Sequence, residues 1–385
     1  MRILLLSAAL LCWGTSALAD LAERVTVFKS GEDGYHTYRI PAVVLAANGD
    51  LLAFCEGRRN SASDSGDIDL VMKRSTDQGA TWGDLELICD HGEGVIGNPA
   101  PVVDRATGDV IVLLTRQDPG THEGAIRAGR DRPREPMVIR STDHGRTWTE
   151  PRSIAATATR PGWRWYATGP CHAIQLEQGD HAGRLVVPAN FSAEGGAVNH
   201  QYSAHALLSD DGGMTWRIGA VDETKLGDNH INPNESTVAE LPDGRLIFST
   251  RDQRGESPAT RAVAYSSDGG ESFDRPYAEE PGLIGPVCQG SLLGIRSEKT
   301  FRLLFSGPSK PGARERMQLR ISDDHGATWH NGPILYEGVA AYSDLVELPD
   351  QRVGCLYEID RYRAIVWSDL PIESLPEAPA EGGGR

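Results

Sequence analysis

The chain has 385 residues and is acidic, with 38 Lys and Arg against 54 Asp and Glu and a formal net charge of −16. This charge argues against a surface for nucleic acid or anionic membrane, because both require clustered Lys and Arg. It also makes any strongly cationic pocket a local exception in this protein.

The first 19 residues have the layout of a secretory signal. Arg2 precedes an apolar run from residue 3 to residue 11, and the small-residue site Ala17-Leu18-Ala19 follows it. This pattern predicts cleavage before Asp20 and export to a periplasm or to the exterior. No later apolar run reaches the length needed to span a bilayer, so we expect no membrane anchor.

An octet with the pattern Ser-x-Asp-x-Gly-x-Thr-Trp occurs five times along the chain. The first copy is STDQGATW at residues 75–82, and the others begin at Ser141, Ser209, Ser266 and Ser322, the fourth copy ending in Ser272-Phe273. The Asp side chain can cap backbone N–H groups and the Gly accepts a positive φ, so the octet predicts a tight turn between two strands. We expect the closing aromatic residue to anchor each turn in the core.

The spacing of the octets predicts the architecture. Successive octets begin 66, 68, 57 and 56 residues apart, which is long for a helical solenoid repeat and suits a four-stranded propeller blade with its loops. Between the octets, short runs with β-like content occur at residues 51–54, 110–114, 184–187, 245–248 and 301–305. No long amphipathic helix is indicated.

Chain length then predicts the number of blades. Residues 20–385 number 366, which gives about six blades at roughly 60 residues each. Five octets are compatible with six blades, because ring closure usually combines both termini in one blade. We therefore predict an all-β, six-bladed β-propeller that forms one domain over residues 20–375, followed by a disordered tail at residues 376–385.

Five cysteines remain after the predicted signal, and they form no CxxC pair: Cys55, Cys89, Cys171, Cys288 and Cys355. At most two disulfides can form, and the sequence does not assign them. Single scattered cysteines are more typical of buried apolar fillers. The eleven histidines show no zinc-site spacing, and no phosphate-binding or dinucleotide fingerprint is present, so we expect no metal and no cofactor.

Four polar segments remain once the turns are set aside. They are Tyr38-Arg39-Ile40-Pro41 at the start of an apolar run, the loop from Glu56 to Asp67, Asn234-Glu235-Ser236-Thr237 followed by Arg251, and Arg314-Glu315-Arg316-Met317 paired with Ala341-Tyr342-Ser343-Asp344. Together with the octets, these segments resemble the sialidases (exo-α-neuraminidases) of bacteria and animals, over essentially the whole mature chain. Each motif is weak alone, whereas their occurrence in this order is very improbable by chance. The resemblance implies hydrolysis of terminal α-linked sialic acids from glycoproteins, glycolipids or oligosaccharides.

The resemblance also implies that three arginines hold the carboxylate of sialic acid: Arg39, Arg251 and Arg314. A guanidinium suits this task because its planar fork binds a carboxylate bidentately and keeps its charge. Arg316 competes with Arg314 for the third place, and the spacing of eight residues to Ser322 favours Arg314.

Asp64 corresponds to the family's general acid/base, which protonates the leaving oxygen and later activates water. Arg58, six residues earlier, matches a further family arginine near the substrate. Asp67 and Asp69 are neighbours that compete with Asp64, and the Ser-Asp-Ser context favours Asp64.

Tyr342 corresponds to the nucleophile and Glu235 to its partner base. The anomeric carbon of sialic acid carries a carboxylate that would repel an attacking Asp or Glu, whereas a neutral phenol avoids that repulsion. The reference pKa of a phenol is about 10, so a nearby carboxylate must accept its proton. The resemblance therefore implies a tyrosyl-linked intermediate and retention of configuration, as known for sialidases.

The segment from Trp163 to Pro170 resembles the family's aromatic wall, so we expect Trp165 to contact substrate, with a core position as the alternative for both tryptophans. Cys171 and His172 stand where the family has small residues, which leaves the shape of this loop open.

Two other functions remain open from the sequence. One is a non-catalytic Asp-box propeller that binds glycans or proteins, although it gives no reason for Arg39, Arg251, Glu235 and Tyr342 to occur together. The other is use of the same site as a trans-sialidase or an intramolecular lyase. Linkage preference and oligomeric state are not readable from the sequence.

Overall fold

The computed structural model describes residues 24–378 except for residues 195–200, 224–230, 257 and 298–299. The predicted export signal at residues 1–19 lies outside the described residues, as do residues 379–385 of the predicted tail. The described part consists mainly of antiparallel β-strands. Its helices are short: α1 (Glu123–Arg127), α2 (Ala155–Ala158), and the 3-10 turns η1 (Gly179–His181) and η2 (Ile372–Ser374).

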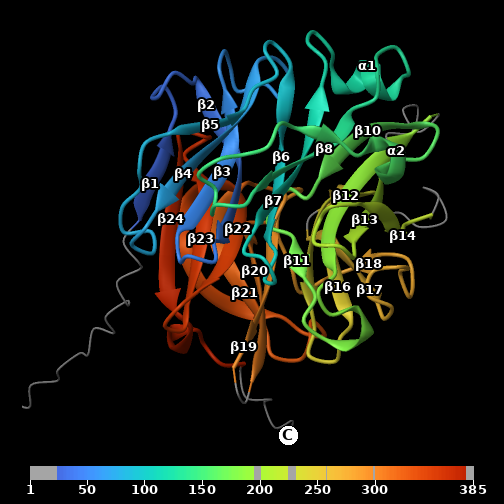
Figure 1. Cartoon of the computed structure of the whole chain (residues 1–385). Coiled ribbons are helices and arrows are strands. Elements are labelled where there is room, and N and C mark those ends of the chain that lie inside the picture. Colours follow the sequence, from blue (N-terminus) through green and yellow to red (C-terminus); the bar gives the residue numbers. More distant parts are fainter. Residues whose placement is uncertain (1–23, 195–200, 224–230, 257, 298–299, 379–385) are drawn as a thin grey trace, which may run out of the picture.

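The strands form six blades of an all-β propeller, as predicted (Figure 1). Blade 1 contains β2 (Thr37–Leu45), β3 (Leu51–Arg58), β4 (Ile68–Ser75) and β5 (Glu86–Cys89). Blade 2 contains β6 (Val95–Val103), β7 (Val110–Gln117), β8 (Glu135–Ser141) and β9 (Arg152–Ser153). Blade 3 contains β10 (Trp163–Thr168) and β11 (Ile174–Gln175), which both pair with β12 (Leu185–Ala193), then β13 (Ser203–Ser209) and β14 (Arg217–Val221).

Blade 4 contains β15 (Pro233–Glu240), β16 (Leu246–Glu256), β17 (Ala259–Ser266) and β18 (Ala278–Glu279). Blade 5 contains β19 (Ser291–Arg296), β20 (Phe301–Pro308), β21 (Glu315–Ser322) and the first half of β22 (His330–Leu348). The second half of β22 opens blade 6, which continues with β23 (Arg352–Ile359), β24 (Ala364–Pro371) and β1 (Val25–Lys29).

Both ends of the chain share the last blade. The N-terminal strand β1 pairs with β24, with Val25 opposite Trp367, and the blue and red strands lie side by side in Figure 1. This confirms the expectation that ring closure combines the two termini, and it explains why five octets accompany six blades. Pairing between the two ends of the chain holds the ring closed.

The octets form the same turn in five blades, each joining the third strand to the fourth. In the third copy, Ser209 Oγ accepts a hydrogen bond from the backbone N of Gly213 at 2.8 Å, and Asp211 accepts one from the backbone N of Thr215 at 2.9 Å. Gly213 has a φ of +81°, and a Cβ there would lie 2.8 Å from Ile111 Cδ1 of the neighbouring blade. Glycine is needed at this position for both reasons.

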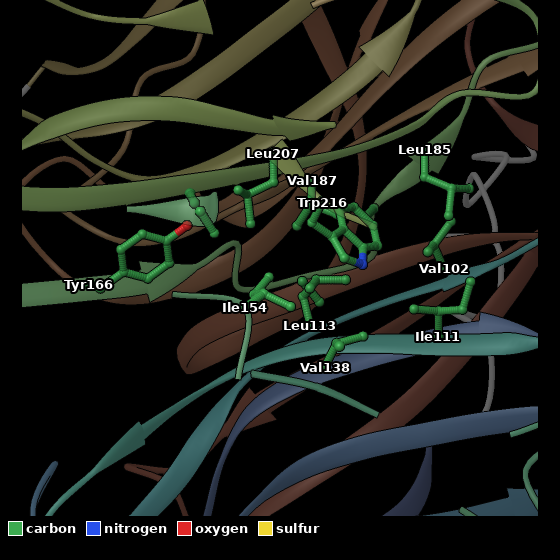
Figure 2. Packing of buried hydrophobic residues seen from close by; sticks show 14 of the residues in the cluster. Val102, Ile111, Leu113, Val138, Ile154, Tyr166, Leu185, Val187, Leu207 and Trp216 are labelled. Atoms are coloured by element: carbon green, nitrogen blue, oxygen red, sulfur yellow. The ribbon is translucent and has the colours of Figure 1, made fainter. Parts of the chain in front are cut away.

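The closing aromatic residue of the same octet packs between two blades. Figure 2 shows Trp216 among side chains of β7 and β12, including Leu113 and Val187, and the Trp216 side chain is buried. The other four closing aromatics are partly buried against their core clusters: Trp82, Trp148, Phe273 and Trp329. The five described cysteines are also buried, and all are free thiols, which confirms their interpretation as fillers.

The direction in which the strands run determines which of their residues lie at the pocket end of the ring. First strands of neighbouring blades contact one another around the axis, as β2 does with β6 and β22. Residues near the start of these strands, such as Arg39 and Glu235, line a polar pocket of about 230 Å³, whereas residues near their ends, such as Leu45 and Glu240, line a separate cavity of about 340 Å³. Second strands return to the pocket and third strands lead away from it. The octets therefore lie at the end of the ring opposite the pocket.

A buried histidine supports the aromatic core of blade 3. His205 on β13 packs against the rings of Trp163, Tyr166 and Phe191 at centroid distances of 4.9, 5.3 and 5.8 Å. Burial lowers the pKa of His205 to about 3, and the nearby Arg160 acts in the same direction. In the unfolded chain the pKa of a histidine is about 6.5. As the pH falls below 6.5, the unfolded state therefore binds a proton that the folded state excludes, and stability is lost.

We expect His205→Phe to weaken the acid sensitivity of the fold. Between pH 7 and pH 4.5 the wild-type protein should lose about 2 kcal/mol more of its free energy of unfolding than the variant does, because only the wild type carries this proton linkage. Urea unfolding at the two pH values measures the difference, with the exposed His36→Gln as the control. Equal losses in wild type and His205→Phe would contradict the prediction.

Candidate active site

All eight residues predicted for the site line the polar pocket of about 230 Å³ at one end of the ring: Arg39, Arg58, Asp64, Trp165, Glu235, Arg251, Arg314 and Tyr342. They come from five of the six blades or their loops, so no local segment contains the site. The structure thus brings the predicted residues together, while their roles remain predictions.

Three guanidinium groups converge on the phenol ring of Tyr342. Arg39 and Arg314 lie with their guanidinium carbons 4.9 and 5.6 Å from the ring centroid, and Arg251 Nη1 lies 3.1 Å from Tyr342 Oη. Arg316 is instead exposed and pairs with Glu337 at 3.0 Å. Of the two arginines that competed for the third position, Arg314 is the one in the pocket.

Tyr342 and Glu235 are in direct contact. Tyr342 Oη donates a hydrogen bond to one carboxylate oxygen of Glu235, and Arg251 donates to the other at 2.7 Å. Burial raises the pKa of Tyr342 well above its usual value, the charge of Glu235 adds to this rise, and the three arginines oppose it. The phenol is therefore neutral at rest, with an acceptor for its proton already in place.

Glu358 on β23 was not predicted as a site residue from the sequence, yet it holds both Arg39 and the backbone of Tyr342. Its carboxylate is fully buried and accepts hydrogen bonds from Arg39 Nε at 2.9 Å and from the backbone N of Tyr342 at 3.1 Å. Burial acts to lower the pKa of Arg39, but Glu358, Tyr342 and Tyr362 together outweigh burial and hold that pKa well above its usual value. Glu358 therefore helps to keep Arg39 charged and links it to the backbone of Tyr342.

Asp64 lies on the loop between β3 and β4, with its side chain 80% exposed. Its carboxylate is 2.7 Å from Arg58 Nη1 and 3.6 Å from Arg39 Nη1. Although the side chain is exposed, the protein groups around it exclude part of the water and act to raise the pKa of Asp64, but Arg58 and Arg39 outweigh this effect and hold that pKa below its usual value. The two competing carboxylates face elsewhere, since Asp67 and Asp69 both pair with Arg59.

The two tryptophans of the aromatic segment have different environments. Trp163 is buried and stacks on Phe191 with ring centroids 3.6 Å apart, whereas Trp165 lines the pocket. The core alternative therefore holds for Trp163 and not for Trp165. Further along the loop, His172 Nδ1 and Asp344 form a buried pair at 2.7 Å.

Arg134 is a second residue that the sequence did not single out. Its guanidinium lies 4.2 Å from the ring centroid of Trp165 and donates to Asn98 Oδ1 at 2.9 Å. Among the described residues no carboxylate lies within ion-pair distance of it, and burial lowers the pKa of Arg134 to about 10. It stands in an arginine-rich stretch, residues 127–134, with no motif to distinguish it. Other pocket residues without a sequence signal are Glu123, Tyr202 and Gln253, whereas Glu56 and Asn234 belong to polar segments that the sequence singled out without giving these two residues a role.

Within the part of the chain that the structure describes, no group of three or more His, Cys, Asp or Glu side chains is placed to hold a metal ion. In the same residues, no helix combines the length and the apolar character needed to cross a membrane.

Comparisons with known proteins identify the family of the chain. Residues 49–355 match the family model described as a BNR repeat-like domain. The chain is 33% identical to a sialidase of Micromonospora viridifaciens over 86% of its own length and 51% of that protein, so it spans about half of that relative. It is 31% identical to an exo-alpha-sialidase of Arthroderma benhamiae over 90% of its own length and 86% of that protein.

Among solved structures, the chain is similar to the Hadza microbial sialidase Hz136, with a TM-score of 0.81 and 29% identity over 92% of this chain and 69% of that one. The sequence match, the BNR repeats and the shared propeller agree with one another. The chain therefore belongs to the family of exo-α-sialidases, glycoside hydrolases built on a six-bladed propeller with Asp-box repeats.

Proposed function

We propose that this protein releases terminal α-linked sialic acids from glycoproteins, glycolipids or oligosaccharides by hydrolysis with retention of configuration. The observation that carries the proposal is the contact of Tyr342 with Glu235 and Arg251 in a pocket that also holds Arg39 and Arg314. A phenol beside a carboxylate provides a nucleophile with its base, and grouped guanidiniums provide a site for the carboxylate of an anionic sugar.

Binding of the substrate carboxylate by Arg39, Arg251 and Arg314 orients the anomeric carbon towards Tyr342. All three guanidiniums are already held by protein groups, so little side-chain freedom is lost on binding. A fixed clamp of this kind lowers the entropic part of the barrier as well as the dissociation constant.

In the first chemical step, Tyr342 Oη attacks the anomeric carbon and its proton passes to Glu235. The bond from that carbon to the glycosidic oxygen breaks, and Asp64 donates a proton to the departing oxygen. The product is a tyrosyl-linked sugar and a free aglycone. In the second step, Asp64 removes a proton from water as the water attacks the same carbon, and Glu235 returns its proton to the phenolate oxygen.

Asp64 must gain a proton before it can act as an acid, although Arg58 and Arg39 lower its pKa in the free protein. The substrate carboxylate offsets the charge of Arg39 and brings a negative charge near Asp64, and both effects raise the pKa of Asp64. Substrate binding therefore prepares the acid for protonation. Displacement of water from the exposed carboxylate acts in the same direction.

The stereochemical course tests the proposed function directly. We expect proton NMR of a sialyllactose digest to show the α-anomer of free sialic acid first, followed by slow mutarotation to the β-anomer, because two displacements retain configuration. Initial release of the β-anomer would contradict the mechanism. Formation of an internal anhydro sugar would show that the site acts as a lyase instead of a hydrolase. Transfer of the sugar to added lactose would show that the site acts as a transferase.

Tyr342→Phe tests the nucleophile. We expect kcat to fall by at least about 100-fold, because the variant lacks the proposed nucleophilic oxygen, while the affinity for 2,3-dehydro-2-deoxy sialic acid changes by less than about threefold. Tyr265→Phe on β17, outside the pocket, is the matched control and should keep the wild-type kcat. Retention of more than about a tenth of kcat in Tyr342→Phe would contradict the assignment.

Asp64→Ala tests the general acid through the leaving group. We expect kcat/KM for sialyllactose to fall by about 100-fold or more, because a sugar alkoxide needs a proton as it departs. For the 4-methylumbelliferyl sialoside the loss should be at least about tenfold smaller, since this leaving group departs readily as an anion. Asp67→Ala, on the same loop but paired with Arg59, is the control. Equal losses on the two substrates would contradict the role of Asp64.

A further inference from the structure

The turn between β23 and β24 has an unusual backbone. Asp360, Arg361 and Tyr362 have φ values of +52°, +57° and +68°, so three successive residues other than glycine occupy the left-handed region. Side chains with a Cβ rarely adopt this region, and a bulky residue such as Tyr does so only where the surroundings enforce it. Such outliers often mark positions where a side chain must be presented in a fixed place.

Neighbouring strands hold this turn in position. The backbone N of Asp360 donates to Val339 O at 2.8 Å, and Ser30 Oγ donates to Tyr362 O at 2.6 Å. Tyr336 Oη also donates a hydrogen bond to the Asp360 carboxylate. The turn is thus attached to β22 and to the segment after β1, which fixes the position of the Tyr362 ring.

The ring of Tyr362 contacts two of the three guanidiniums in the pocket. Arg39 lies with its guanidinium carbon 4.0 Å from the Tyr362 ring centroid, so Arg39 contacts the rings of both Tyr362 and Tyr342. Arg314 Nη1 donates a hydrogen bond to Tyr362 Oη at 3.2 Å. One side chain therefore sets the positions of Arg39 and Arg314 relative to each other.

The partners of the three arginines differ in charge. Arg39 pairs with Glu358 and Arg251 pairs with Glu235, whereas among the described residues no carboxylate lies within ion-pair distance of Arg314. Neutral oxygens hold Arg314, namely Tyr362 Oη and Val287 O, both at 3.2 Å. Neutral partners orient a guanidinium without offsetting its charge, so Arg314 keeps its full attraction for a substrate anion.

We propose that Tyr362 is a positioning residue of the carboxylate clamp: it fixes Arg39 through its ring face and Arg314 through its hydroxyl, and so determines how strongly the protein prefers a free carboxylate at this position. This inference rests on the proposed function, in which the three arginines bind the carboxylate of sialic acid. The alternative is that Tyr362 only fills the space beside Ile40 and Ala341, against which it packs.

Paired inhibitors separate the two roles. We would measure inhibition constants for 2,3-dehydro-2-deoxy sialic acid and for its methyl ester, in which the carboxylate charge is absent. Tyr362→Phe removes only the hydroxyl, and should weaken binding of the free acid about three- to tenfold. Tyr362→Leu also removes the ring face, and should weaken it by more than about tenfold. Binding of the ester should change by less than about twofold in both variants, and KM for the sialoside should rise more than kcat falls.

Tyr265→Phe is the control, because it also removes only a tyrosine hydroxyl, on β17 and outside the pocket. It should leave the preference for acid over ester unchanged. Equal weakening of acid and ester in the Tyr362 variants, or no change in either, would overturn the inference. If Tyr362→Leu fails to fold, Tyr362→Phe alone decides. A wild-type protein without sialidase activity would instead refute the proposed function, and acid and ester binding by calorimetry would still test the clamp.

Discussion

The pocket depends on holding several buried guanidinium groups together within a protein that carries a net charge of −16. Like charges at this spacing repel one another, and burial removes the water that would otherwise screen them. Three carboxylates offset part of the charge: Glu358, Glu235 and Glu56. The rings of Tyr342 and Tyr362 also contact Arg39. The compensation is incomplete at Arg314, and an anionic ligand would complete it.

The propeller supplies the rigidity that such a cluster needs. The Asp-box turns lie at one end of the ring and the polar pocket lies at the other. The residues of the turns and those of the pocket can therefore change independently. Asp344 connects the blades near the axis, since it accepts hydrogen bonds from the backbone N of Val43, the backbone N of His172 and the hydroxyl of Ser291. It stands two residues after Tyr342 on the same strand, so the strand that carries the phenol is also fixed at the centre of the ring.

Under the proposed mechanism, neither Tyr342 nor Asp64 has its reactive protonation state in the free protein. Tyr342 is neutral because burial and Glu235 raise its pKa, and Asp64 is ionised because Arg58 and Arg39 lower its pKa. The arriving carboxylate offsets the charge of Arg39, a charge that lowers the pKa of both groups. Substrate recognition and activation of the acid are thus coupled by charge, with no need for a conformational switch.

The sequence alone determined the propeller, because an Asp-box turn is complete within eight residues and its chemistry is visible wherever it recurs. It also pointed to the residues that line the pocket, through motifs carried by a family resemblance. Other features of the site depend on the tertiary structure. Arg314 and Arg316 look alike in sequence, and a positive φ of +64° at Arg316, with a shift of strand register beside it, sends them in different directions. Glu358 meets Arg39 across 319 residues, and Tyr362 reaches Arg314 through a strained turn without glycine. Contacts of this kind depend on strand register and ring closure, which bring together residues whose local sequence carries no sign of one another.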